Sequence, residues 1–245
     1  MSRGYKMTKK TISRDEALHN LRKYIGHDLG LYAEKYNITI EKDGKINKGW
    51  KGQVLEQLAG LDNNNIRAPD GGDFELKSVV HTRKGDKWDP KETMAITMID
   101  EASLAKEDDF YKTHLWSKLE KLICCATSFE GSGAKTSKLL SVTSFEFLDG
   151  DETIKEIKKD YEDIREKSIK DGFHSLSGKD GTWIQPRTKG QGGVNPRTGQ
   201  PNPKTRAFYA RKDLVRKLFE PNAKAKSSLH KVSGAQIGIP LTDDE

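Results

Sequence analysis

"GWKGQVLEQLAGLDNNNIRAPDGGDFELKS", from Gly49 to Ser78, contains two hydrophobic periods in succession. Its first part repeats apolar residues at helical spacing and predicts a helix over Gly49–Leu61. Turn-forming residues follow, and "DFELKSVV" then alternates with period two, which predicts a strand. On this strand Glu75 and Lys77 share one face with Val79, while the opposite face carries Phe74, Leu76 and Ser78. The stretch therefore predicts a helix, a turn and a strand that presents two ionisable side chains on one side of a sheet.

The rest of the chain also alternates between helical and strand patterns. Helices are predicted over Ser13–Ile25, Asp109–Glu120 and Glu152–Lys170, and strands over Glu92–Asp100, Lys121–Glu130 and Leu139–Asp149. The glycine-rich stretch 131–138 predicts a hairpin between the last two strands. Strands mixed with helices, with a hairpin among them, indicate an α/β or α+β fold with a mixed central sheet flanked by helices.

Composition indicates a folded protein with a heavily charged surface. The 245 residues suffice for one sizeable domain, or for two lobes on a shared core. Charged residues make up 33% of the chain and mean hydropathy is -0.80, but clear apolar patterns remain. The net charge of +6 is a mild indication of a polyanionic partner.

The two cysteines, Cys124 and Cys125, are neighbours in an apolar run. On a strand their thiols would point to opposite faces, so we expect two reduced core thiols in a cytoplasmic protein. The basic N-terminal stretch is not followed by the apolar run of a signal peptide, and no stretch is long enough to span a bilayer. Neither secretion nor a membrane partner is expected.

Asp70, Glu75 and Lys77 form the pattern P-D-x4-E-x-K. Two carboxylates aimed at one point repel each other unless a cation lies between them, and ligands that are oxygen-rich and thiol-free suit Mg²⁺. A metal there can lower the pKa of a bound water, and a nearby ammonium can orient that water and stabilise charge on a phosphate. This chemistry fits phosphodiester hydrolysis. Taken alone, the pattern is weak, and in a chain that is one-third charged it favours a surface salt bridge over a catalytic site.

Several blocks in order give the pattern a context. The stretches "NKGWKGQVLEQLAG" and "PDGGDFELKS" are followed by "KETMAITMI", "THLWSKLEKLICC", "IKKDYEDI", "GTWIQPRTKG" and "RAFYARKDL". In this order they resemble the MutH/Sau3AI family of DNA endonucleases, within the PD-(D/E)xK superfamily. The resemblance covers roughly residues 29–219. It implies a restriction-endonuclease-like fold with two lobes around a DNA cleft, and double-stranded DNA as the substrate.

The resemblance implies a role for several single residues. Asp70 and Glu75 match the metal-binding carboxylates, the backbone carbonyl of Leu76 is a further ligand, and Lys77 matches the catalytic lysine. Glu56 matches an additional active-site glutamate near the metal, the alternative being a solvated helix residue. The expected cofactor is Mg²⁺, with Mn²⁺ as a substitute and no nucleotide cofactor.

Lys48 and Lys118 match lysines near the cleft and its DNA phosphates, the alternative for both being ordinary surface lysines. Glu92 falls where the family has a glutamate near the DNA, and a strand-end residue in solvent is the equal alternative. His81 and His114 do not have a metal-ligand spacing, so we interpret them as structural or phosphate-adjacent, with no zinc site.

A basic arm from Arg187 to Lys212 contains no acidic residue and is rich in glycine and proline between Gly190 and Pro203. It is predicted to begin as a mobile loop and to end in a strand and a helix, "RAFYARKDLVRKLF". Phosphate contacts need lysine or arginine, and base reading needs side chains that can fork onto base edges. The predicted DNA-binding residues of the arm are Arg187, Lys189, Lys204, Arg206, Tyr209 and Arg211. A solvated linker is the alternative.

The arm also departs from the family. MutH has an arginine directly before the proline of "IQPR", where this chain has Gln185, with Arg187 after the proline. The departure puts the recognised sequence and any response to base methylation in doubt, and a GATC-type target is carried over from the family only as a guess.

Three functions follow from these observations. The first is a Mg²⁺-dependent, sequence-specific endonuclease of the type II restriction class. The second is a MutH-like nickase of methyl-directed mismatch repair, activated by a MutL-type partner. The third is a DNA-binding module without catalysis. In each case residues 1–222 are expected to form one domain, with a catalytic lobe at about 13–130 and a recognition arm at about 177–219, and 223–245 to form a poorly ordered tail.

Overall fold

A computed structural model describes residues 12–61, 72–148, 150–190, 197, 199–200 and 204–220. Its central element is a four-stranded sheet in the order β4-β3-β6-β7, made of β3 (Glu75–Lys84), β4 (Lys87–Pro90), β6 (Lys121–Ser128) and β7 (Leu139–Glu146). Strand β3 pairs with β6 in parallel, whereas β4 and β7 are antiparallel to their neighbours. The predicted α+β class with a mixed central sheet is confirmed.

A second, antiparallel sheet has the order β5-β9-β8 and consists of β5 (Met94–Ile99), β9 (Arg206–Ala210) and β8 (Ile184–Thr188). The strands predicted within "KETMAITMI" and in the basic arm therefore exist, but they form a sheet of their own. A two-stranded ribbon, β1 (Glu41–Lys42) with β2 (Lys45–Ile46), completes the sheets of the described residues.

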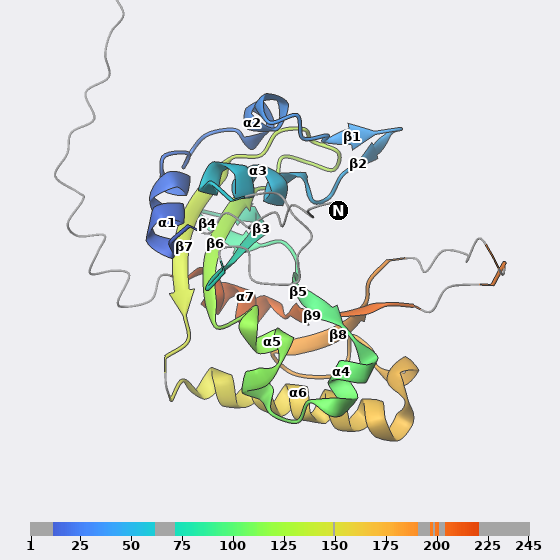
Figure 1. Cartoon of the computed structure of the whole chain (residues 1–245). Coiled ribbons are helices and arrows are strands. Elements are labelled where there is room, and N and C mark those ends of the chain that lie inside the picture. Colours follow the sequence, from blue (N-terminus) through green and yellow to red (C-terminus); the bar gives the residue numbers. More distant parts are fainter. Residues whose placement is uncertain are drawn as a thin grey trace, which may run out of the picture.

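Helices cover both faces of the central sheet (Figure 1). On one side lie α1 (Arg14–Arg22), α2 (Leu29–Lys35) and α3 (Trp50–Ala59). On the other lie α7 (Lys212–Phe219), the short α5 (His114–Ser117) and the second sheet, with α4 (Glu101–Lys106) and the long α6 (Glu152–Asp171) beyond it. Two 3₁₀ turns, η1 (Phe110–Lys112) and η2 (Phe173–Ser175), flank these helices. No helix in the described part of the chain combines the length and apolar composition that crossing a membrane requires.

Each face of the central sheet belongs to a different hydrophobic core. Leu76 and Cys125 pack into the core beneath α1–α3, while Val79 and Cys124 pack into the core shared with α6, α7 and the second sheet. The prediction that the two thiols point to opposite faces is confirmed, and both are buried and reduced. The alternation read from "DFELKSVV" is thus real, and β3 separates the two cores.

One predicted helix, Asp109–Glu120, is wrong as a continuous element. Thr113 is extended between η1 and α5, and its hydroxyl oxygen accepts a hydrogen bond from the Trp116 N–H at 3.0 Å. A threonine that caps a new helix in this way competes with continuation of the previous turn. By contrast, the helix predicted over Ser13–Ile25 exists as α1, and Ser13 caps it by accepting from the Glu16 N–H at 3.1 Å.

Candidate active site at the start of strand β3

Parallel pairing of β3 and β6 brings two distant ionisable groups together. In a parallel pair both strands begin at the same edge, and here Glu75, the first residue of β3, is paired with Leu122 near the start of β6. Lys118 lies just before β6, at the end of α5. Its Nζ is 2.6 Å from Glu75 Oε2.

Lys77 forms an ion pair with the other oxygen of the Glu75 carboxylate. Its Nζ is 2.7 Å from Glu75 Oε1 and also donates to the Ile96 carbonyl oxygen of β5 at 3.1 Å. The prediction that Glu75 and Lys77 share a face of the strand is therefore confirmed. The contact with Ile96 in addition links β3 to the second sheet.

The cluster is largely removed from solvent. Glu75 is 4% exposed and Lys118 7% exposed. Burial raises the pKa of the Glu75 carboxyl, but the charges and hydrogen bonds of Lys77 and Lys118 together outweigh burial, so this pKa lies below its ordinary value. Glu75 is thus held as a carboxylate. The alternative of an ordinary surface lysine is wrong for Lys118.

The donor chemistry of the cluster fits a hard divalent cation. The Glu75 carboxylate offers oxygen ligands, which such a cation prefers, and the thiol of the neighbouring Cys124 has its pKa raised by burial, so it is not a thiolate ligand. Both Glu75 oxygens are within hydrogen-bond distance of lysine ammonium groups, and a cation bound there would compete with them. Among the described residues, no group of three His, Cys, Asp or Glu side chains could hold a metal. Asp70, the second predicted carboxylate, lies outside the described residues. The metal site therefore stays a prediction.

The other predicted residues of this site lie on adjoining elements. Glu56 is half-buried on α3, the helix that packs against β3 near Gly52 and Ser78. Leu76 follows Glu75 on β3 and its side chain is buried in the core beneath α3. Lys48 is exposed just before α3, where a surface lysine and a phosphate contact are both compatible with its position.

In the second sheet, Arg187 of β8 and Tyr209 of β9 lie against each other. The guanidinium carbon is 5.2 Å from the centre of the tyrosine ring, and Arg187 Nη1 donates to Thr93 Oγ1 at 2.8 Å. Arg187 pairs in register with Ala207, so Tyr209 is its diagonal neighbour on the same face. This arrangement holds an exposed arginine in one direction. Gln185, at the family departure, is buried and lies on the same face of β8 as Arg187, opposite Tyr209.

Two arginines of the arm that are predicted to bind DNA donate hydrogen bonds to the protein's own backbone. Arg206 is 9% exposed, donates to the His174 carbonyl oxygen at 2.9 Å and stacks on Phe173. Arg211 donates to the carbonyl oxygens of Gly178, Asp180 and Gly181. These hydrogen bonds give both arginines a structural role in the fold, so Arg187, Lys189, Lys204 and Tyr209 are the stronger DNA-binding candidates of the arm. Lys189 and Lys204 are exposed.

Three further predicted residues lie at the margins. His81 is buried, with Nδ1 2.9 Å from the Val79 carbonyl oxygen and its ring against Phe219, so it is structural. Glu92 is exposed before β5, and His114 begins α5. Much of the predicted loop 190–203 lies outside the described residues, as does the tail 223–245.

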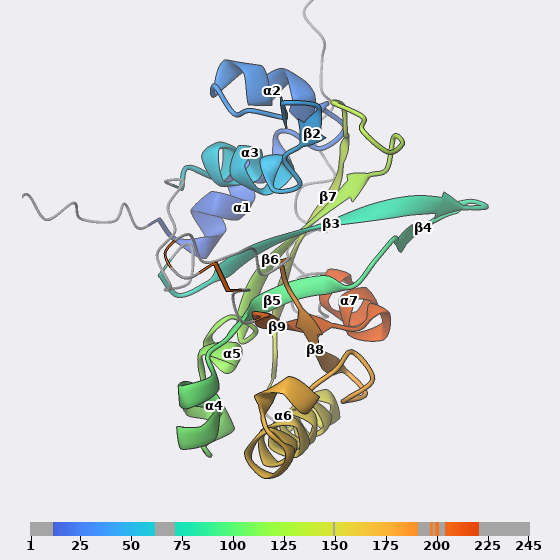
Figure 2. The ribbon, with the colours of Figure 1, turned by 90° about the vertical axis from the view of Figure 1, so that its right-hand side faces the viewer.

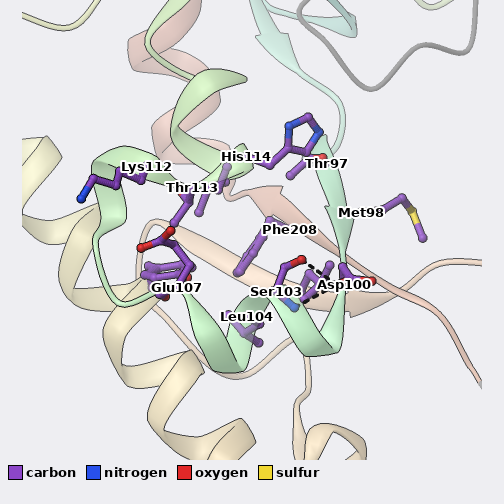
Figure 3. Close-up of a pocket in the computed structure, with 13 residues that line it drawn as sticks. Thr97, Met98, Asp100, Ser103, Leu104, Glu107, Lys112, Thr113, His114 and Phe208 are labelled. Carbon is purple, nitrogen blue, oxygen red and sulfur yellow. Dashed lines mark hydrogen bonds between the residues drawn. The ribbon is translucent and has the colours of Figure 1, made fainter.

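A pocket of about 400 Å³ does not include the Glu75 cluster (Figure 3). It is lined by the end of β5, α4 and the η1–α5 segment, including Thr97, Asp100 and His114. The Asp100 carboxylate points back into its own helix, where it accepts hydrogen bonds from the Ser103 N–H and hydroxyl. Since the pocket contains neither Glu75 nor a lysine of the cluster, its position does not alter the assignment of the site.

Sequence reasoning missed two groups of the site. The Ile96 carbonyl and the Thr93 hydroxyl hold Lys77 and Arg187 respectively, and neither belongs to a motif. Thr93 lies within the strand predicted over Glu92–Asp100, so its place in a strand could be predicted. Its contact with Arg187 of β8 could not, because the sequence does not show which strands lie together.

Comparison with known proteins finds a family model that matches the middle of the chain. Residues 61–156 match the family model described as DNA mismatch repair enzyme MutH. No curated protein matches the chain. One similar solved structure, the restriction endonuclease MvaI in complex with cognate DNA, has a TM-score of 0.39 and 14% identity over 86% of this chain and 98% of that chain, and no residue role is transferred from it. The resemblance to the MutH family is therefore confirmed over residues 61–156, the segment that carries Glu75, Lys77 and Lys118.

Proposed function

We propose that the chain is a Mg²⁺-dependent, sequence-specific endonuclease that hydrolyses phosphodiester bonds of double-stranded DNA, of the type II restriction class. The observation that carries the proposal is the buried Glu75 carboxylate between Lys77 and Lys118, at distances of 2.7 and 2.6 Å. The match of this segment to the MutH family supports it. A GATC-type target is part of the proposal.

In this proposal Asp70, Glu75, the Leu76 carbonyl and Glu56 hold the cation. Bound Mg²⁺ would supply a more acidic water and neutralise charge on the phosphate. Lys77 orients the attacking water and stabilises the charge that develops on the phosphate oxygens. Lys118 fixes the Glu75 carboxylate from its second oxygen. Arg187 and Tyr209 read bases, while Lys48, Lys189 and Lys204 bind phosphates.

The first test uses supercoiled plasmid and the full-length chain. Asp70→Ala and Lys77→Ala should abolish cleavage in Mg²⁺ and leave DNA binding in Ca²⁺ nearly intact, because they remove the chemistry and not the phosphate contacts. Asp73→Ala and Lys106→Ala, which change exposed residues of the same types, are the matched controls. Cleavage by both site variants at the wild-type rate would overturn the assigned site. Binding of DNA without cleavage by the wild type would favour the inactive module.

A second candidate function, a MutH-like nickase of mismatch repair, is favoured by the description of the matched family as a mismatch repair enzyme. The same plasmid separates the two roles. Rapid linearisation by the chain alone supports restriction. Weak nicking that a MutL-type protein stimulates, and that falls on unmethylated strands, supports repair.

A further inference from the structure

Asp160 is a buried carboxylate that the proposed chemistry does not use. It lies on α6, is 5% exposed, and accepts hydrogen bonds from three consecutive backbone N–H groups. Thr182 donates to Oδ1 at 2.7 Å, and Trp183 and Ile184 donate to Oδ2 at 2.6 and 2.9 Å. Thr182 and Trp183 lead directly into β8, which begins at Ile184 and carries Arg187.

The opposite side of the same turn is held by Arg211. Its guanidinium donates to the carbonyl oxygens of Gly178, Gly181 and Asp180 at 2.9, 3.0 and 3.2 Å. Asp160 thus accepts hydrogen bonds from the N–H groups of the turn, and Arg211 donates hydrogen bonds to its carbonyl oxygens. We call these two side chains the β8 anchor. The fit is close, because a Cβ on Gly181, whose φ is +74°, would run into the Ile184 carbonyl oxygen and lie 3.2 Å from Asp160 Cγ.

The anchor lies where it can set the position of β8, the strand that carries Arg187. Strand β8 is an edge strand that pairs only with β9 in the described sheet, so the turn before it is a further constraint on its register, beside the packing of Ile184 in the core. A slip of one residue in a strand turns every side chain to the opposite face. Arg187 lies three residues after Ile184, and its contacts with Thr93 and Tyr209 require the present register. Asp160 itself is fixed, since its neighbours Ile157, Tyr161 and Ile164 are buried in the core.

We propose that Asp160, together with Arg211, is a positioning residue for sequence recognition, because it sets the register and direction of β8 and thereby the aim of Arg187. This inference rests on the proposed function. It assigns to Arg211 a role in holding the strand instead of a phosphate contact, and it places a specificity determinant on α6, a helix outside the recognition arm.

The test compares wild type with Asp160→Asn, and with Asp163→Asn, an exposed aspartate of the same helix, as the matched control. In Asp160→Asn, but not in Asp163→Asn, hydrogen exchange of the free protein should be at least about tenfold faster at the amides of residues 182–184 than in the wild type. The reason is that the asparagine NH₂ group replaces one of the two carboxylate oxygens and cannot accept a hydrogen bond. Amides of β6 should be unchanged. DNA binding is then measured in Ca²⁺ with a pool of duplexes whose central segment is randomised. The ratio of affinities for the preferred and the average sequence should fall about tenfold in Asp160→Asn, which is within the discrimination of one bidentate base contact.

Arg211→Met provides an independent variant if Asp160→Asn fails to fold. An anchor role predicts a broadened preference with an unchanged dependence of affinity on salt, whereas a phosphate contact predicts a salt slope that is shallower by about one. Unchanged exchange at residues 182–184, or retention of the full sequence preference by both variants, would overturn the inference. If the wild type neither binds nor cuts duplex DNA, the proposed function fails, and with it the recognition role, while hydrogen exchange still decides whether Asp160 holds the strand.

Discussion

Lys118 Nζ lies 2.6 Å from Glu75 Oε2, although 43 positions separate the two residues in the chain. The contact exists because β3 and β6 run in parallel and the α5–β6 connection ends where β3 begins. Lys118 is therefore part of the interior of the candidate site, and its charge helps to keep Glu75 ionised.

Replacement of this lysine should affect folding and catalysis together. In Lys118→Met a buried carboxylate oxygen loses its charged partner, so we expect the free energy of unfolding to fall by about 1–3 kcal/mol. We expect cleavage to fall by at least about a hundredfold, because Glu75 is no longer fixed. Urea unfolding and plasmid cleavage measure the two effects. Lys106→Met, which changes an exposed lysine of α4, should match the wild type in both. Wild-type stability and rate in Lys118→Met would contradict the role of this contact.

The pH dependence of stability should reveal the ionised state of Glu75. Burial raises its pKa and the two lysines lower it by more, so the pKa in the folded protein lies below the ordinary value of 4.5. Such a group contributes stability above that ordinary value and loses the contribution as pH falls through the folded pKa. Glu75→Gln should therefore be about 3–5 kcal/mol less stable than the wild type near neutral pH, with a gap that narrows below about pH 4.5. Urea unfolding at a series of pH values measures the gap. A gap that stays constant down to acidic pH would show that Glu75 is not held as a carboxylate.

Arg187 and Lys204 should differ in what they contribute to DNA binding. Arg187 is exposed and aimed by Thr93 and Tyr209, so Arg187→Ala should lose about 1–3 kcal/mol of preference for the best sequence. Lys204→Ala should weaken binding to all sequences alike and make the salt slope shallower by about one. Binding to the randomised duplex pool at several salt concentrations measures both. Equal losses on every sequence in Arg187→Ala would remove this arginine from the residues that read bases.

Arg206 should contribute to stability and not to DNA binding. Its guanidinium is buried, donates to the His174 carbonyl oxygen and stacks on Phe173. Arg206→Met should lower the free energy of unfolding by about 1–3 kcal/mol and leave the salt slope of DNA binding unchanged. Thermal or urea unfolding together with the salt titration tests this, with Lys204→Ala as the reciprocal control. If Arg206→Met keeps the stability of the wild type but its DNA affinity depends less steeply on salt, Arg206 contacts DNA phosphate and this prediction is wrong.

The sequence alone predicted the elements well where their periodicity was strong. The alternation around Glu75 gave both the strand and the two faces of β3, and the apolar stripe after Gly49 gave α3. The helix expected over Asp109–Glu120 was broken because Thr113 can cap as well as continue a helix, and spacing does not distinguish the two.

Pairings between distant segments could not be read in the same way. A lysine near the cleft was expected at position 118 from family resemblance, but its contact with Glu75 depends on the register of a parallel strand pair, which leaves no local pattern. A count of charges likewise does not reveal that Arg206 and Arg211 bind carbonyls of their own fold. Asp160 was missed because its partners are backbone N–H groups, and any sequence supplies those.

The adjacent thiols of β6 make each half of the protein separately observable. Cys124 faces one core and Cys125 the other, and burial raises the pKa of Cys125 to about 12 and that of Cys124 well above its ordinary value. An alkylating reagent reaches neither sulfur until the layer above it comes away. Mass spectrometry of the peptide that contains both cysteines would therefore distinguish two kinds of unfolding. Labelling of Cys125 first would show that the helices α1–α3 detach before the layer that contains the second sheet, and simultaneous labelling of both would show that the two layers come apart at once.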